Sequence, residues 1–524
     1  MHRRIGIAAV IVAAGVLLSR ILGLVRDVVF AGVLGADRFT DEYVLAFAIP
    51  DWINYLLAGG YMAITFIPIL SRYLARGDEE GGWRAFGAIA KPVALGMTAL
   101  VVLAMVVAEP VIRVIAPDFT PEQVDRTVRL TRIVLPAQVF FVVGSLFMAV
   151  QYAKERFVVP TFAPIVYNLG IIAGGVLYNV GRDDPSPEGF AWGVLAGSLV
   201  GNFALQWWGA RREGLRIPRE AGFGDPVFKE YLMLAVPLMV GQSLVLLDEQ
   251  LGRTFGTFTE DGGVSWLQFA RRTMLVPVGV IAQAAGVAAY PYLARLHAEG
   301  DERLLAATVE RALRYVIVLS LFAATGLVAL SIPIVRLLYQ RGGWEAVDTV
   351  GTAGALVFFG LGVPLWGAQQ IISRGFYARR EMWTPVVIGT AATVAAIPIY
   401  WALLEAYEVR GLALASTVAL TLYTVVLGAV WYRRTGTRFL RPVLRSFGRA
   451  LPLAALGGLA AWAIAELLRD AIDGAAGALL ALAAGGAALG TVVLLTGGAL
   501  RDLAAGRNTA DGFHLDPTER GDAG

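Results

Sequence analysis

The chain has 524 residues, of which 57% are hydrophobic and 16% are charged, with a net charge of +3 at pH 7 and no cysteine. Because soluble domains carry about 25% charged residues, this composition excludes a water-soluble globular protein. The small net charge argues against a nucleic-acid-binding surface, and the lack of cysteine excludes disulfides and thiolate metal sites.

Apolar stretches long enough to cross roughly 30 Å of hydrocarbon recur from end to end of the chain. They predict about fourteen transmembrane helices and hence an all-α polytopic membrane protein. The first stretch has a basic start, like a signal peptide, but its apolar pattern continues through Leu34, so we expect it to be retained as a helix. In chain order the predicted helices cover 5–34, 42–74, 88–115, 125–153, 160–180, 188–210, 229–258, 264–297, 305–338, 347–377, 384–406, 410–432, 446–468 and 474–499.

Lysine and arginine occur mainly in alternate loops between these helices, whereas loops 181–188 and 259–263 are acidic or nearly neutral. Basic loops are retained in the cytoplasm. Both termini are therefore expected on the cytoplasmic side. The basic loops contain Arg72 and Arg76, Lys154 and Arg156, Arg211 and Arg212, Arg295 and Arg303, Arg379 and Arg380, and Arg433 and Arg434.

Two motifs occur twice in the chain. The segment FIPILSRYLARGDEE, from Phe66, is echoed by AYPYLARLHAEGDER, from Ala289, and QYAKERFVVPTF, from Gln151, is echoed by FYARREMWTPVV, from Phe376. This spacing predicts two six-helix lobes of the same membrane orientation around a central cavity. The expected divisions are lobes 1–215 and 216–440, two accessory helices in 441–500 and a disordered cytoplasmic tail, 501–524.

The first predicted helix carries three charges in the stretch SRILGLVRDVVF. At 100° per residue, Arg20, Arg26 and Asp27 lie on one polar stripe that covers about a third of the helix. A charge at the bilayer centre costs at least about 2.5–3.5 kcal/mol. The stripe is either an anchor at the headgroups or the cationic wall of a cavity in which Asp27 orients the arginines, and the position of Arg20 between long apolar runs favours the cavity.

Charges interrupt two helices of the second lobe as well. Arg271 and Arg272 lie within VSWLQFARRTMLVP, and we expect at least one of them to face a cavity. Asp248, Glu249 and Arg253 cluster in LVLLDEQLGRTF. An ion pair between Glu249 and Arg253, one turn apart, and a cation or substrate site are equally open interpretations of this cluster.

Polar residues also begin the second predicted helix. Asp41 follows Thr40, where a carboxylate interacts favourably with a helix N-terminus. Pro50 lies further along the same helix, and Asp51 and Asn54 follow it within about one turn. A proline inside a membrane span frees a backbone carbonyl and permits bending, which a gated transporter could use.

No motif in the chain is typical of an enzyme. The three histidines, His2, His297 and His514, are isolated, so no metal cluster is expected. The glycine-rich segments lack the strand and the lysine of a phosphate-binding loop. We therefore expect neither catalysis nor a bound cofactor.

Six segments together resemble the MurJ (MviN) lipid II flippases of the multidrug/oligosaccharidyl-lipid/polysaccharide exporter superfamily. They are SRILGLVRD, LGADRFTDEYVLAFAIP, FIPILSRY, QYAKERFVVPTFAPIVYN, GGVSWLQFARR and GFYARREMWTP, and the likeness covers residues 15–435. The resemblance implies two six-helix lobes plus two extra helices. It also implies that the chain moves an undecaprenyl-pyrophosphate-linked peptidoglycan precursor across the bacterial cytoplasmic (inner) membrane by alternating access.

The resemblance assigns substrate contacts to Arg20, Arg26, Asp27, Asp41 and Arg272, and we add Asn54. Asn54 and Tyr55 stand where the family commonly has a basic pair. The eleventh predicted helix lacks the Asn and Asp of the family's sodium site, which leaves Asp248 as a possible cation ligand. Coupling to sodium, to protons or to the membrane potential stays open, and the chain is expected to act as a monomer among membrane lipids.

Three other functions remain as alternatives. Two belong to the same superfamily, namely flipping of another polysaccharide unit and cation-coupled drug export. The third is a non-transporting membrane scaffold. Exporters of organic cations require acidic, aromatic cavities, and a scaffold has no need for Arg20 in the middle of the membrane, so the arginines favour a flippase for an anionic lipid-linked substrate.

Overall fold

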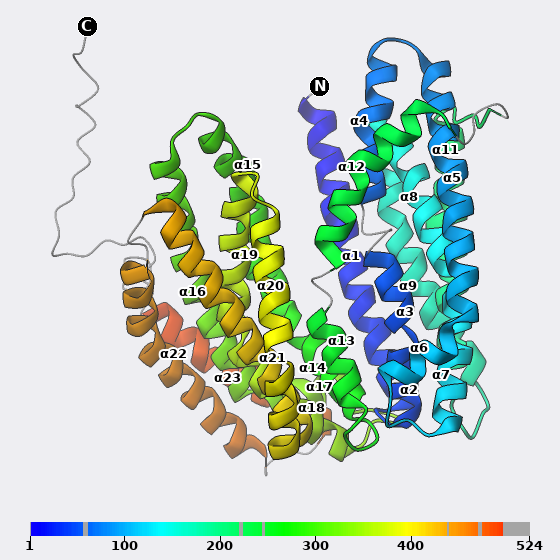
Figure 1. Ribbon diagram of the computed structural model, residues 1–524. Helices are drawn as coiled ribbons and strands as arrows, with labels where there is room; N and C mark the ends of the chain where they lie inside the picture. Colours follow the sequence, from blue (N-terminus) through cyan, green and yellow to red (C-terminus); the bar gives the residue numbers. More distant parts are fainter. Residues whose placement is uncertain are drawn as a thin grey trace, which may run out of the picture. The chain divides into compact units, whose positions relative to one another are not determined.

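The computed structural model describes residues 2–55, 61–218, 224–243, 247–436, 440–469 and 474–495, and every regular element in these ranges is helical (Figure 1). The predicted all-α class is thereby confirmed, whereas the predicted tail 501–524 lies outside the described residues. The helices of the first half are α1 (His2–Leu34), α2 (Arg38–Ala46), α3 (Ala48–Ile53), α4 (Tyr61–Ala75), α5 (Glu79–Val106), α6 (Ala108–Ile115), α7 (Pro121–Val134), α8 (Ala137–Ala153), α9 (Val158–Asn179), α10 (Glu188–Gly197), the π-helical η2 (Ser198–Ala204) and α11 (Leu205–Arg212).

The second half continues in the same manner. Its helices are α12 (Pro226–Ser243), α13 (Leu247–Gly256), α14 (Gly263–Val278), the π-helical η4 (Gly279–Gln283), α15 (Ala284–Ala298), α16 (Glu302–Ala329), α17 (Ser331–Tyr339), α18 (Ala346–Leu361), α19 (Val363–Ala378), α20 (Trp383–Ala395) and α21 (Ile397–Thr435). Two further helices follow, α22 (Leu440–Arg469) and α23 (Gly474–Leu495).

Helices lie in all fourteen predicted stretches, but the eleventh and twelfth, 384–406 and 410–432, share α21, whose backbone is non-helical at Glu408. Seven described spans are long and apolar enough to cross a membrane, and the pair α18 and α19, which bends by 44°, makes eight if counted as one span. Several other stretches are divided, as in α2 and α3, where Pro50 lies inside α3. Proline removes a helical hydrogen bond, which favours a break in the helix near Pro50.

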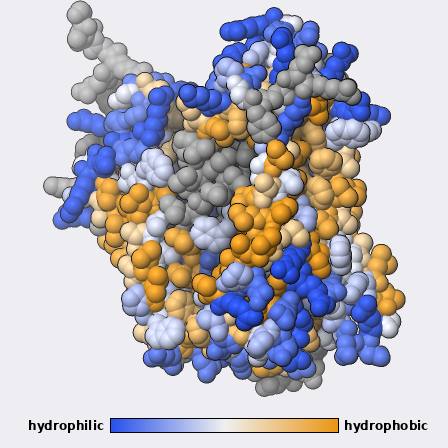
Figure 2. Space-filling view, turned by 45° about the vertical axis from the view of Figure 1, so that its right-hand side comes forward, coloured by the Kyte–Doolittle hydropathy of each residue, from blue (hydrophilic) through white to orange (hydrophobic). Residues whose placement is uncertain are grey.

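The side chains on the outer faces of these helices suit a hydrocarbon environment. On α5, Leu95, Val102 and Val106 are more than half exposed, as are Leu459 and Leu467 on α22. Figure 2 shows large hydrophobic areas on one face of the molecule, with hydrophilic side chains gathered mainly toward its top and bottom. Exposed apolar area on this scale is typical of a surface that contacts lipid.

The described contacts divide the chain into two compact units. One contains residues 1–273, 334–359 and 382–419, and the other contains 274–333, 360–381 and 420–524. In the first unit, phenylalanine rings of α4, α5 and α8 pack in a row, with centroids 5.6 Å apart for Phe66 and Phe86 and 5.9 Å for Phe86 and Phe147. This division follows packing rather than sequence halves, so lobes 1–215 and 216–440 stay a prediction.

The first copy of the repeated motifs forms an ion pair at a helix start. Asp78 caps α5, where its carboxylate accepts a hydrogen bond from the backbone N–H of Gly81 at 2.8 Å. The next residue, Glu79, binds the ammonium group of Lys154 at 2.9 Å. Glu155, which follows Lys154, has a left-handed backbone with φ of 58°.

The second copy repeats this arrangement in the other unit. Asp301 caps α16 by accepting from the backbone N–H of Leu304 at 2.9 Å, and Glu302 pairs with Arg379 at 3.6 Å. Arg380, which follows Arg379, has φ of 62°. The two motifs that echo each other in sequence therefore make the same cap, the same ion pair and the same turn, as expected of a duplicated unit.

Helix α9 packs closely against α10 through glycines, and α1 packs against α9 (Figure 1). A Cβ atom added to Gly193 of α10 would lie 2.7 Å from the carbonyl oxygen of Gly170 and 2.8 Å from the Cα of Ile171. Small residues let helix backbones approach closely in membranes. This contact fixes α9 as a support for α1, the helix with the charged stripe.

We expect Gly193→Leu to destabilise the protein by about 1–3 kcal/mol or more, because the side chain would collide with backbone atoms that have no room to move. Gly96→Leu on α5 is the matched control, since no atom lies within 4 Å of its added Cβ. Thermal unfolding of both purified variants in the same detergent measures the difference. Equal midpoints for the two variants would contradict this account of α9 and α10.

Candidate functional site

The charged stripe of α1 faces protein at Asp27, which is 7% exposed. Arg26 donates from Nε and Nη2 to Oδ1 of Asp27, at 3.1 and 2.9 Å. Its Nη1 donates to Oδ1 of Asn168 on α9 at 3.1 Å, and the amide nitrogen of Asn168 donates to the carbonyl of Pro164 at 2.9 Å. Two helices therefore hold the guanidinium of Arg26 in one orientation.

Arg272 of α14 reaches the same carboxylate. Its Nη1 donates to Oδ1 of Asp27 at 2.5 Å, so a single oxygen atom receives hydrogen bonds from Arg26 and Arg272. The side chain of Arg272 is 40% exposed, whereas that of Asp27 is 10% exposed. Two guanidinium groups against one carboxylate leave one uncompensated positive charge, which an anion could neutralise.

Arg26, Asp27 and Arg272 line a cavity of about 230 Å³, whose walls come from α1, α2, α3, α9, α10, α13 and α14. Three tyrosines, Tyr43, Tyr55 and Tyr167, contribute aromatic surface with hydroxyl groups. The cavity also contains a third arginine and two further carboxylates. Its charged lining residues are Arg26, Asp27, Asp51, Glu249, Arg253 and Arg272.

Arg253 of α13 joins α13 to α3. Its Nη2 lies 2.8 Å from Oδ2 of Asp51 and 2.8 Å from Oε1 of Glu249, one turn earlier on α13. The Arg253 side chain is only 6% exposed. Of the two interpretations left open for this cluster, the structure contains the ion pair, and it adds Asp51 as a second carboxylate partner.

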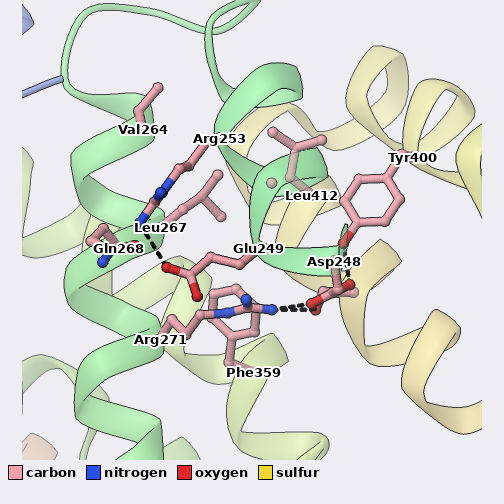
Figure 3. Close-up of a pocket in the computed structure, with 12 residues that line it drawn as sticks. Asp248, Glu249, Arg253, Val264, Leu267, Gln268, Arg271, Phe359, Tyr400 and Leu412 are labelled. Carbon is pink, nitrogen blue, oxygen red and sulfur yellow. Dashed lines mark hydrogen bonds and ion pairs between the residues drawn. The ribbon is translucent and has the colours of Figure 1, made fainter. Parts of the chain in front are cut away.

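Asp248 points away from this cluster into a smaller pocket, shown in Figure 3. Its Oδ2 accepts from Nη2 of Arg271 and from the hydroxyl of Ser416, the latter at 2.8 Å. Its Oδ1 accepts from the hydroxyl of Tyr400 at 2.7 Å. Gln268 and the pair Glu249 and Arg253 line both this pocket and the larger cavity, so the two spaces adjoin.

The carboxylate of Asp41 acts at the start of another helix. Its Oδ2 accepts from the backbone N–H of Gly262 at 2.8 Å, and its Oδ1 accepts from the backbone N–H of Ser265 at 2.7 Å and from the Ser265 hydroxyl. The N-terminus of its own helix, α2, is capped instead by Asp37. Asp41 thus ties α2 to α14 through the N-terminal dipole of α14.

Three predicted contacts lie outside the cavity lining, namely Asp41, Arg20 and Asn54. Arg20 is an exposed residue of α1, nearly two turns before Arg26. Asn54 ends α3 as its C-terminal cap and is half-buried beside Tyr55, which does line the cavity. Substrate contacts by Arg20, Asn54 and Asp41 stay predictions.

Sequence reasoning missed Asn168, Tyr400 and Ser416, which orient the charged groups. One signal was available for Asn168, because it is a polar residue inside an apolar span, and such residues usually have a partner. Tyr400 and Ser416 lie in α21, and their spacing carries no sign that they meet Asp248. In the described part of the chain no three His, Asp or Glu side chains converge as metal ligands.

Comparisons with known proteins agree on one family. The family model described as lipid II flippase MurJ matches residues 30–496. A probable lipid II flippase MurJ of Rhizobium tropici is 29% identical over 423 residues, 79% of each chain. The lipid II flippase MurJ of Burkholderia cenocepacia is 27% identical over 395 residues, 74% of this chain and 76% of that protein.

Solved structures show the same fold. A lipid II flippase MurJ in an inward closed conformation superposes with a TM-score of 0.75 at 21% identity, covering 94% of this chain and all of that one. An inward-facing multidrug resistance MATE family transporter of the MOP superfamily gives 0.66 at 14% identity, covering 80% of this chain and 94% of that one.

The different burial of two arginines predicts different effects on stability. Arg253→Met would leave Asp51 and Glu249 without their buried partner, so we expect a loss of about 3–5 kcal/mol. Arg272→Met should cost far less, because Asp27 keeps Arg26 and Arg272 is 40% exposed. Thermal unfolding of both variants measures this.

The triple variant Arg253→Met, Asp51→Asn, Glu249→Gln is the control, since it removes all three charges together. Its midpoint should recover much of the loss. No recovery would mean that packing of the Arg253 stem, rather than its charge, stabilises α13.

Proposed function

This chain belongs to the lipid II flippase MurJ family, and from that premise we propose that Arg26 and Arg272 bind the pyrophosphate of the lipid-linked precursor. The function is that of the family, lipid II flipping, in a multi-pass protein of the bacterial inner membrane. The observation that carries the site proposal is the single oxygen of Asp27 shared by both arginines.

Asp27 keeps the cavity ready for an anion. Without substrate its carboxylate compensates Arg26 and Arg272, which would otherwise be costly in a low-dielectric environment. An arriving pyrophosphate offers several oxygen atoms to the same donors, and the planar fork of arginine suits two oxygens at once. Asp27 thus orients the two arginines, and the substrate replaces it as their partner.

The remaining predicted contacts have a place in this proposal. Arg20, nearly two turns before Arg26 on α1, would attract the headgroup before it reaches Arg26. Asn54, beside Tyr55, would contact a neutral part of the headgroup, because an amide can both donate and accept.

Alternating access requires one end of the cavity to be closed while the other is open. The Asp41 carboxylate, with its three hydrogen bonds at the start of α14, supports closure at that end because it joins α2 to α14. Opening there would break these bonds. The energy for the cycle would come from a sodium gradient, a proton gradient or the membrane potential. Asp248 matters here because it is the possible ligand of a coupling cation.

We expect Arg26→Ala and Arg272→Ala to lower flipping about tenfold or more at normal abundance, because each removes a charge-assisted contact to the pyrophosphate. Arg→Lys at both positions should restore it only in part. Complementation of a strain depleted of its lipid II flippase, with leaflet-specific labelling of the precursor, measures this.

Arg113→Ala is the matched control for these variants. Arg113 is a half-exposed arginine of α6 whose partner is Glu109, one turn earlier. Flipping by the three alanine variants at one common rate would show that Arg26 and Arg272 are only structural anchors. Full activity of the lysine variants would exclude two-oxygen recognition.

The orientation of the termini has its own test. The chain has no cysteine, so single cysteines introduced at Asp183, Gly214, Asp261 and Gly436 give labels without background. We expect positions 183 and 261 to react with an impermeant reagent from outside, and 214 and 436 to react only in opened cells, because the basic loops remain cytoplasmic. The reverse pattern would overturn the proposal that both termini are cytoplasmic.

A further inference from the structure

The pocket around Asp248 has the composition of a site for a monovalent cation. A carboxylate and the two hydroxyl groups of Tyr400 and Ser416 meet within hydrogen-bond distance, at 2.7 and 2.8 Å from the carboxylate oxygens. Hard cations are held by oxygen ligands of these kinds.

A positive charge from the chain already occupies this position. Nη2 of Arg271 donates to Oδ2 of Asp248 and, at 3.2 Å, to the hydroxyl of Ser416 (Figure 3). The Arg271 side chain is 13% exposed, and its guanidinium also lies over the ring of Phe359, 5.6 Å from the centroid. Arginine does not lose its proton in proteins. The donor set of Asp248 therefore does not fit an added cation.

We propose that Arg271 is a tethered cation at Asp248, and that this chain consequently works without binding sodium at that carboxylate. The charge of the pair is zero, so an added sodium ion would have to displace a guanidinium that contacts both Asp248 and Ser416. The pocket beside the pair measures about 20 Å³, enough for about one water molecule. Charge rather than space therefore opposes an added cation.

Because Arg271 lies next to Arg272 on α14, the tethered cation would move together with the proposed substrate contact. Arg271 and Arg272 are adjacent on α14, yet one binds Asp248 and the other binds Asp27. A shift of α14 that accompanies substrate binding at Arg272 would therefore act on the Asp248 pair as well. A diffusible ion would have to be coupled to the substrate site indirectly, whereas this charge moves with the helix that carries the substrate contact.

The test measures thermal unfolding of the purified full chain in sodium chloride and in choline chloride at equal ionic strength. We expect the midpoint of the unmodified chain to be the same in both salts. Arg271→Gln should have a lower midpoint in choline that sodium raises saturably, by about 2–3 °C at 100 times the dissociation constant. Asp248→Asn combined with Arg271→Gln should be stable and insensitive to sodium, because neither charge remains.

Two results would overturn the inference. One is a midpoint of the unmodified chain that rises with sodium and loses this response in Asp248→Asn. The other is an Arg271→Gln variant that ignores sodium, because the pocket would then not be a cation site at all. Should Arg271→Gln not fold, Arg271→Lys provides the comparison, since a shorter cation that keeps the midpoint independent of sodium supports the tether, and a sodium response contradicts it.

The role of the tethered cation in transport rests on the proposed function, whereas the absence of sodium binding at Asp248 does not. The unfolding midpoints test the Asp248 pair alone, whereas the flipping assay tests Arg26 and Arg272. Flipping by the unmodified chain in sodium-free medium should equal flipping in sodium. If the midpoints behave as expected but the Arg26 and Arg272 variants flip normally, the tethered cation is supported and the proposed pyrophosphate site is wrong.

Discussion

The carboxylate of Asp27 is the group on which the cavity depends. A guanidinium in a low-dielectric environment needs a partner, and Asp27 supplies one for Arg26 of its own helix and for Arg272 of α14 through the same oxygen. The pairing lets α1 carry charge in an apolar span. Because one carboxylate pairs with two guanidinium groups, an excess of positive charge remains beside Asp27. The interaction that stabilises charged residues in an apolar span therefore also favours binding of an anion.

The packing of the helices sets the geometry of that interaction. Asn168 can orient Arg26 only because α9 lies against α1, and α9 is held in turn by its close glycine contact with α10. At the start of α14, Asp41 replaces solvent as the partner of backbone N–H groups that the helix itself leaves unpaired. Arg272 is thus positioned from two sides, by the cap of its helix and by its ion pair.

Sequence periodicity predicted the helical class and placed Arg26 and Asp27 on one face of α1, because both follow from local geometry. The resemblance then added Arg272. Neither predicted that Arg271 and Arg272, neighbours in the chain, bind different carboxylates, or that Asp41 caps α14 rather than α2. Arg272 and Asp27, like Asp41 and Ser265, are more than 200 positions apart, whereas Arg271 and Asp248 are 23 apart. All of these pairings depend on helix rotation, which a single sequence does not contain. The contacts of Asn168, Tyr400 and Ser416 with the charged groups could not be predicted for the same reason.

The charges of the first compact unit also explain how one cavity can be selective without being strongly charged. Arg26, Arg253 and Arg272 face Asp27, Asp51 and Glu249, so the formal charges of the cavity sum to zero. The arrangement is nevertheless asymmetric, because Arg253 is enclosed by two carboxylates while Asp27 is shared by two arginines. An organic cation would meet arginines beside Asp27 and a carboxylate pair already bound to Arg253. An anion would meet the guanidinium groups of Arg26 and Arg272, which share a single acceptor oxygen of Asp27. In the proposed function, selectivity for a phosphate-bearing headgroup would follow from how the charges are paired rather than from their number.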